Sequence, residues 1–79
     1  MPTLYVGGLP PETDSDALRR MFAEFGDLAA ARVVMRPSDG RCRGFGYVTF
    51  RTREAAKQAR SALDGTILDG GTLRVADAG

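Results

Sequence analysis

The segment that most constrains this chain is Arg-Gly-Phe-Gly-Tyr-Val-Thr-Phe, which occupies residues 43–50. Successive side chains of a strand point to opposite faces of a sheet. A strand here carries Phe45 and Tyr47 on one face, and Val48 and Phe50, the expected core residues, on the other. The two glycines of the segment give the aromatic rings little cover and allow close backbone approach. The pattern therefore predicts a strand with an exposed aromatic pair.

Two arginines, Arg41 and Arg43, stand beside this aromatic pair. Unpaired bases stack on aromatic rings, and guanidinium groups bind phosphate. The segment therefore favours a surface for single-stranded nucleic acid. The alternative is an ordinary amphipathic strand whose aromatic residues are covered by a terminal helix or a partner, but little chain remains to provide such a cover.

Length and composition predict one domain over residues 1–79, because a chain of 79 residues with 43% apolar residues builds only one modest core. No segment has the roughly 18 apolar residues of a membrane span, and the first ten residues lack a signal-peptide pattern. Cys42 is the only cysteine, which excludes an internal disulfide and is typical of a reducing compartment. We expect an intracellular protein, cytoplasmic if bacterial, and nuclear or cytoplasmic if eukaryotic.

The charges are nearly balanced, with a net charge of +1, which argues against strong electrostatic binding of duplex nucleic acid. Their distribution is more informative. Most acidic residues fall on predicted helices and turns. Five arginines fall on predicted strands or on the loop that joins two of them: Arg32, Arg36, Arg41, Arg43 and Arg74.

The first half of the chain reads as strand, helix, strand. Residues 3–7 alternate as a strand with Tyr5 on the outer face. Thr13 is the predicted N-cap of a helix, with Asp14 and Asp16 in its first turn, and Gly26 is its predicted stop. The expected core residues of this helix are Leu18, Met21, Phe22 and Phe25. Residues 28–36 follow as a strand whose predicted core face carries Ala31, Val33 and Met35.

The second half reads as strand, helix, strand. Residues 37–40 are strong turn formers, so the strand before them and the octapeptide strand after them should form a hairpin. Thr52 can cap a second helix that runs to about Leu63. The small apolar side of this helix consists of Ala55, Ala56, Ala59, Ala62 and Leu63. Residues 72–76 are the last predicted strand, with Leu73 and Val75 facing inward.

This order of elements is that of the ferredoxin-like βαββαβ sandwich, an α+β fold. In this fold two helices cover one face of a four-stranded antiparallel sheet. The other face of the sheet, where the exposed aromatic residues are expected, remains open to solvent.

With this element order, the octapeptide indicates that the chain resembles the RNA recognition motif family. It looks similar to the small stand-alone bacterial members of the family, and the alternative is a domain excised from a larger protein. A second family motif, a hexapeptide on the first strand, is present as residues 4–9. The resemblance implies that Tyr5, Phe45 and Tyr47 stack on bases and that Arg43 forms a salt bridge with phosphate. The further arginines expected to contact RNA are Arg32, Arg41 and Arg74.

The chain departs from the family pattern at two positions. Gly8 stands where the hexapeptide often has Asn, which alters the loop that follows the first strand. Asp77 stands where family members often carry basic or base-contacting residues. Specificity that such a tail supplies in relatives is therefore not expected from this segment.

Other chemistry has little support. The absence of His excludes His-based catalysis and His metal sites, and no phosphate-binding glycine motif occurs, so we expect no enzyme, no cofactor and no metal.

The expected partner is single-stranded RNA of about two to four nucleotides, and we expect single-stranded DNA to bind more weakly. We expect the protein to be a monomer that does not bind membranes. The main alternative is a protein-binding module of the same fold that recognises a peptide through the sheet or a helix. An acyl-phosphate hydrolase on this scaffold is a distant third, because residues 7–13 lack the positioned Arg that it needs.

Overall fold

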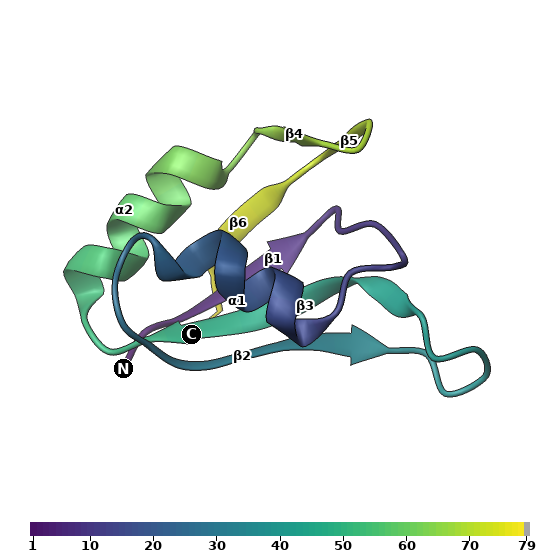
Figure 1. Cartoon of the computed structure of the whole chain (residues 1–79). Coiled ribbons are helices and arrows are strands. Elements are labelled where there is room, and N and C mark those ends of the chain that lie inside the picture. Colours follow the sequence, from purple (N-terminus) through teal and green to yellow (C-terminus); the bar gives the residue numbers. More distant parts are fainter. Residues whose placement is uncertain (79) are drawn as a thin grey trace.

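Four strands form one antiparallel sheet in the computed structural model, which describes residues 1–78 (Figure 1). In order of pairing, they are β2 (Leu28–Met35), β3 (Cys42–Phe50), β1 (Thr3–Gly7) and β6 (Arg74–Asp77). The octapeptide strand and the hexapeptide strand are therefore neighbours at the centre of the sheet. This arrangement confirms the predicted ferredoxin-like fold.

Two helices, α1 (Ser15–Ala23) and α2 (Arg53–Leu63), cover one face of the sheet (Figure 1). The buried helix residues are Leu18, Phe22, Ala55, Ala56 and Ala59. The prediction for Ala62 is wrong, because this residue is exposed. Ala59 and Leu63, four residues apart, lie on the same side of α2. Ala59 is buried in the core, and Leu63 is partly buried against it.

The caps of the two helices differ in how well they were predicted. Thr52 caps α2 as expected, since its Oγ1 accepts a hydrogen bond from the Ala55 N–H at 3.2 Å. The N-cap of α1 is Asp14, whose carboxylate accepts from the Ala17 N–H at 2.8 Å, and the prediction of Thr13 is wrong. The Thr13 N–H donates to the Pro10 carbonyl at 3.1 Å, so the turn after the prolines extends through Thr13 and delays the helix by one residue.

The core lies between the helices and the inner face of the sheet. The Phe22 ring of α1 meets the Phe50 ring of β3 with 6.3 Å between centroids. Both rings are fully buried, as are Leu4 and Val48 of the two central strands. The predicted inward residues of the last strand, Leu73 and Val75, are buried too. The predicted faces of β1, β3 and β6 are therefore confirmed.

The hairpin of β2 and β3 is irregular near its turn. Val33 pairs with Gly46, but Met35 pairs with Cys42, so residues 43–45 stand opposite the single residue 34. Such a bulge kinks a strand and redirects its side chains. Met35, predicted in the core, is 43% exposed, because this end of the hairpin projects beyond the helices (Figure 1).

A small hairpin between α2 and the last sheet strand was not predicted. It consists of β4 (Ile67–Leu68) and β5 (Gly71–Thr72), and β6 begins only at Arg74, two residues later than expected. Its turn has positive φ at Asp69 and Gly70, and an Asp-Gly pair is a known hairpin signal. Gly8 lies against this hairpin with φ +79°, and a β-carbon at Gly8 would collide with the Thr72 carbonyl oxygen. Gly8, where relatives often have Asn, therefore suits the close packing of this loop against the Thr72 backbone.

Candidate nucleic-acid interface

Three aromatic rings meet on the sheet face that the helices leave uncovered. Tyr5 of β1 pairs directly with Tyr47 of β3, and Phe45 pairs with Gly7 in the next row. The ring centroids of Tyr5 and Phe45 are 5.9 Å apart, and each lies 6.2 Å from the centroid of Tyr47. We call Tyr5, Phe45 and Tyr47 the aromatic platform.

The rings of the platform have different orientations. Tyr5 and Phe45 are stacked with an interplanar angle of 29°, whereas Tyr47 stands at 90° to Phe45 and at 69° to Tyr5. All three side chains are half-buried, since they cover one another while both helices of residues 1–78 lie on the opposite face of the sheet. The platform thus presents apolar ring surface to water, which suits stacking on planar ligands.

Arg32 of β2 extends the platform at one side. It pairs with Tyr47 across the strands, and its guanidinium carbon lies 5.7 Å from the centre of the Tyr47 ring. This is the geometry of a cation–π contact, which holds the guanidinium beside the ring while leaving it exposed. The structure therefore brings Arg32 into the same row as Tyr5 and Tyr47.

Arg74 of β6 lies on the other side of the platform. It pairs with Gly7, which in turn pairs with Phe45, so these three residues form the next row across the sheet. Its side chain is 75% exposed and has its Nε 3.9 Å from a carboxylate oxygen of Asp64. Asp64 also accepts a hydrogen bond from the Val75 N–H at 2.9 Å and so fastens β6 beside the end of α2.

The two remaining predicted arginines lie toward the hairpin turn. Arg43 is exposed on the bulge of β3, two residues from Phe45. Arg41 belongs to the loop between β2 and β3 and lies outside the four strands of the sheet. The structure thus groups Tyr5, Phe45, Tyr47, Arg32 and Arg74 on one sheet face, with Arg43 at its end and Arg41 beyond it.

Thr3 and Thr49 were not predicted as site residues. They pair across β1 and β3, next to the row of Tyr5 and Tyr47, and their hydroxyl oxygens are 2.8 Å apart in a hydrogen bond. Hydroxyl groups can donate and accept hydrogen bonds with base edges. The alternation that places Phe45 and Tyr47 outward also places Thr49 there, so this signal was present in the sequence.

Asp39 organises the turn between β2 and β3. Its carboxylate receives a hydrogen bond from the Arg36 guanidinium at 2.7 Å and from the Arg41 N–H at 3.0 Å. The backbone N–H of Arg41 and the Arg36 guanidinium hold the pKa of the Asp39 carboxyl below its ordinary value of 3.8. The predicted turn at residues 37–40 is thus closed by an ion pair between Arg36 and Asp39.

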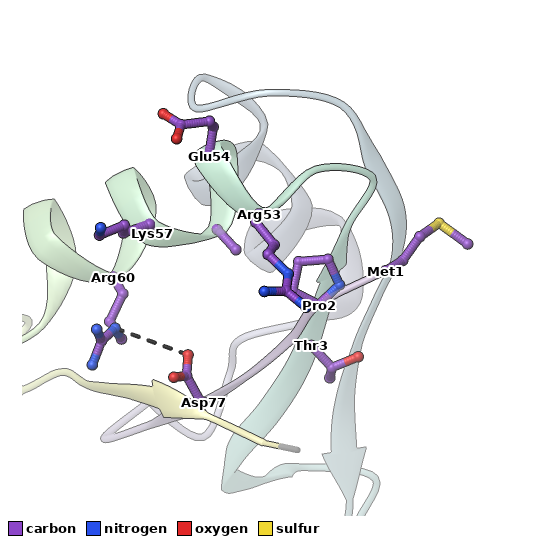
Figure 2. A pocket seen from close by; sticks show the side chains of 9 residues that line it. Met1, Pro2, Thr3, Arg53, Glu54, Lys57, Arg60 and Asp77 are labelled. Atoms are coloured by element: carbon purple, nitrogen blue, oxygen red, sulfur yellow. Dashed lines mark ion pairs between the residues drawn. The ribbon is translucent and has the colours of Figure 1, made fainter.

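A separate polar hollow of about 660 Å³ lies between α2 and the outer ends of β1 and β6 (Figure 2). Its lining mixes cations, among them Arg53, Lys57 and Arg60, with the carboxylate of Asp77. Figure 2 shows Arg60 and Asp77 turned toward each other, with Nε and Oδ1 3.9 Å apart. This hollow has no aromatic lining, in contrast to the open face of the sheet.

Within residues 1–78, no group of three or more acidic, Cys or His residues is arranged to hold a metal ion. No helix in this part of the chain is long and apolar enough to cross a membrane. The aromatic platform with its arginines is therefore the most distinctive chemical feature among these residues.

A model of the RNA recognition motif family matches residues 4–74. The chain is 46% identical to glycine-rich RNA-binding protein 2, mitochondrial, of Arabidopsis thaliana over 72 residues, and this match covers 91% of the chain and 46% of that protein. It is 44% identical to the 28 kDa ribonucleoprotein, chloroplastic, of Spinacia oleracea over 72 residues, and this match covers 91% of the chain and 31% of that protein. The chain thus spans less than half the length of either relative.

The fold is similar to that of a crystal structure of RNA binding protein PG1, with a TM-score of 0.92 and 29% identity over 99% of this chain and 94% of that one. The octapeptide, the hexapeptide and the sheet order agree with this likeness. The chain therefore belongs to the RNA recognition motif family and is an RNA-binding module.

Proposed function

We propose that this module binds short, single-stranded RNA by stacking bases on the aromatic platform. The observation that supports this most directly is the cluster of three half-buried rings on the uncovered sheet face, with centroids 5.9–6.2 Å apart. Bases of a duplex are already stacked and paired, whereas unpaired bases can lie on exposed rings. A platform of this size accommodates two or three stacked bases, so the bound segment has about two to four nucleotides.

The arginines around the platform bind the phosphates of the same strand. Arg32 and Arg74 flank the platform on opposite sides, and Arg43 lies at its end, so a strand that crosses β1 and β3 passes within reach of these guanidinium groups. Arg41 in the loop contacts the strand as it leaves the sheet. Single-stranded DNA binds the same surface more weakly, because it lacks the 2′-hydroxyl groups.

The module works as a monomer and without catalysis. Proteins of the RNA recognition motif family are generally non-enzymatic, and stacking with phosphate contacts requires no reactive group.

The assignment of residues 1–79 to one domain stays a prediction. The two relatives are named mitochondrial and chloroplastic, which is compatible with an intracellular protein and leaves the expected choice of cytoplasm or nucleus unconfirmed.

The test is a titration of the chain with a short unstructured RNA, followed by amide chemical shifts. We expect the largest shifts at Tyr5, Phe45 and Tyr47, with few shifts along α2. Shifts confined to α2 and its polar hollow, on addition of a peptide instead of RNA, would favour the protein-binding alternative. Unchanged spectra at saturating RNA concentration would contradict the proposal.

A further inference from the structure

The side of β6 that faces away from β1 is an outer edge of the sheet, and no other strand of residues 1–78 pairs with it. The Ala78 N–H donates to the Thr3 carbonyl at 2.9 Å and therefore points toward β1. Backbone groups of successive strand residues point to alternate sides, so the N–H and the carbonyl of Asp77 point to the outer side. Val75, two residues earlier, has the same direction, and its N–H donates to the Asp64 carboxylate at 2.9 Å instead of to β1.

This edge is bonded at its start and open at its end. The Leu73 N–H donates to the Thr66 carbonyl, and the Leu73 carbonyl accepts from the Gly65 N–H, both at 2.8 Å. The carbonyl of Val75 and both backbone groups of Asp77 have no hydrogen-bond partner in the part of the chain that the structure describes. We call these three unpaired groups the free edge of β6. An unpaired strand edge is a template on which another extended chain can add.

The polar hollow begins where this edge is open. Asp64, just after α2, bonds to Val75, and Arg60, one turn earlier, has its Nε 3.9 Å from the Asp77 carboxylate, two residues later. The helix and the strand therefore run side by side in opposite directions. Lys57, almost one further turn back along α2, lines the hollow with Arg60 and Asp77 (Figure 2). The hollow thus continues the line of the free edge along α2.

Two cations of the hollow are not neutralised by the protein. Arg53 and Lys57 are exposed and line the hollow, and neither forms an ion pair within residues 1–78. Figure 2 shows Arg53 directed from α2 toward the start of β1, whereas Glu54 points away from it. The ligand that matches this part of the hollow is therefore anionic.

The free edge determines which kind of anion matches the whole site. A peptide in extended conformation offers the N–H and carbonyl groups that pair with a strand edge, whereas a nucleic acid has no such ladder. The hollow also lacks an aromatic side chain on which a base could stack. Alternate residues of a strand lie about 6.8 Å apart, and four residues of a helix rise about 6 Å. Acidic residues at alternate positions of a peptide therefore match the spacing of Arg53 and Lys57.

We propose that the free edge of β6 and the polar hollow together form a docking site for an extended acidic segment of a partner protein. The segment adds as a further strand beside residues 75–77, and its alternate Asp or Glu side chains pair with Lys57 and Arg53. This inference goes beyond the proposed function and leaves it in place, because the aromatic platform lies on the sheet face opposite the helices. The module then binds RNA and a protein partner at the same time.

The test is a titration of the chain with a blocked peptide of alternating Glu and Val, followed by amide chemical shifts. We expect shifts at residues 75–77 and along α2 from Arg53 to Arg60. The affinity should be the same when a short unstructured RNA already saturates the platform. A fully N-methylated version of the peptide keeps the charges but has no N–H donors, and it should bind about two- to tenfold more weakly for each hydrogen bond lost. A peptide of alternating Lys and Val should not bind.

Substitutions locate the charges. Lys57→Gln and Arg53→Gln should each weaken binding of the acidic peptide by about two- to fivefold, the range for an exposed ion pair. The matched control is Arg20→Gln, because Arg20 is an exposed cation of α1 that does not line the hollow. Lys57→Arg, which keeps the charge, should preserve binding. RNA affinity should be unchanged in all four variants, and their amide spectra establish that the fold is retained.

The possible failures are distinct. The proposal is refuted if the acidic peptide at millimolar concentration shifts no amide of α2 or β6, or if Arg20→Gln weakens binding as much as Lys57→Gln. If RNA shifts the α2 amides and displaces the peptide, the hollow binds nucleic acid and the proposal is wrong. If the amides of residues 75–77 shift with protein concentration alone, the free edge pairs with a second copy instead. If the peptide binds but no RNA reaches the platform, the proposed function fails and the docking site stands.

Discussion

The aromatic ring of Tyr5 lies over the α-carbon of Gly7, two residues further along β1. A β-carbon on Gly7 would come within 2.5 Å of the Tyr5 hydroxyl oxygen and within 2.9 Å of two ring carbons. Residues i and i+2 of a strand share a face, so a side chain at position 7 would occupy the place of the ring. The lack of a side chain at Gly7 thus permits the stacked arrangement of Tyr5 and Phe45.

The first prediction is that Gly7→Ala weakens RNA binding while the fold remains. The new methyl group must displace the Tyr5 ring, which costs the platform about one base-stacking contact, roughly 1–3 kcal/mol. Binding is measured by titration with a short unstructured RNA, and folding by amide spectra. As a control, Gly7→Ala in a Tyr5→Ala background should cause little additional loss, because the displaced ring is already absent. Full additivity of the two losses would contradict this explanation.

The second prediction separates the platform from the core. Phe45→Ala or Tyr47→Ala should each weaken RNA binding by roughly 1–3 kcal/mol, with melting curves close to those of the unmodified chain. Phe50→Ala should instead lower the free energy of unfolding by roughly 3–5 kcal/mol, because it opens a cavity next to Phe22. Thermal melts and RNA titrations of the same three variants check both parts. An unchanged affinity after replacement of both Phe45 and Tyr47 would exclude stacking on the platform.

The third prediction concerns Arg43, which is exposed at the end of the platform. Arg43→Ala should weaken binding of all RNA sequences about equally. It should also reduce the slope of log K against log salt by about 0.7, the value for one phosphate contact with a single strand. Titrations of two homopolymeric RNAs over a range of salt concentrations measure both quantities. A change in base preference would show that Arg43 contacts a base edge instead.

The fourth prediction follows from the lowered pKa of Asp39. A carboxyl group whose pKa is lower in the folded state stabilises that state above its unfolded pKa and loses this effect as the pH falls through the folded pKa. The hydrogen bond from the Arg41 N–H and the pair with Arg36 should therefore persist as the pH falls to the ordinary value of 3.8 and break only below it. The Arg41 amide shift, followed from about pH 6 to pH 2, reports this transition. Asp39→Asn should abolish it, and a transition above the ordinary pKa would contradict the sign.

The fifth prediction is that the 79-residue chain binds a short RNA with a dissociation constant of about micromolar or poorer at physiological salt. Two or three stacked bases, at roughly 1–3 kcal/mol each, must offset an association cost of about 4–15 kcal/mol. The net charge of +1 adds little long-range attraction. Several Lys or Arg residues appended after Gly79 should tighten binding and steepen its salt dependence. Nanomolar binding of a four-nucleotide RNA by the unmodified chain would contradict this account.

Several features of the molecule follow from local sequence alone. The alternation in residues 43–50 was sufficient to assign Phe45 and Tyr47 to one face and Phe50 to the other. Spacing along the chain gave the order of the six main elements, and the two motifs together gave the family. These predictions succeed because backbone geometry sets the direction of each side chain within a strand or helix.

The tertiary structure decided the features that depend on how separate segments meet. The position of Thr13 in a turn moved the cap of α1 to Asp14, and the projection of the hairpin exposed Met35. The bulge that contains Gly44 and the hydrogen bond from the Leu9 N–H to the Gly44 carbonyl fasten the loop after β1 to β3, and no periodicity of the sequence indicates this contact. Local pattern specifies which way a side chain points, but cavities, ion pairs and close approaches arise from contacts between residues distant in the sequence. For this reason the aromatic platform could be predicted from the chain itself, while its surroundings required the folded structure.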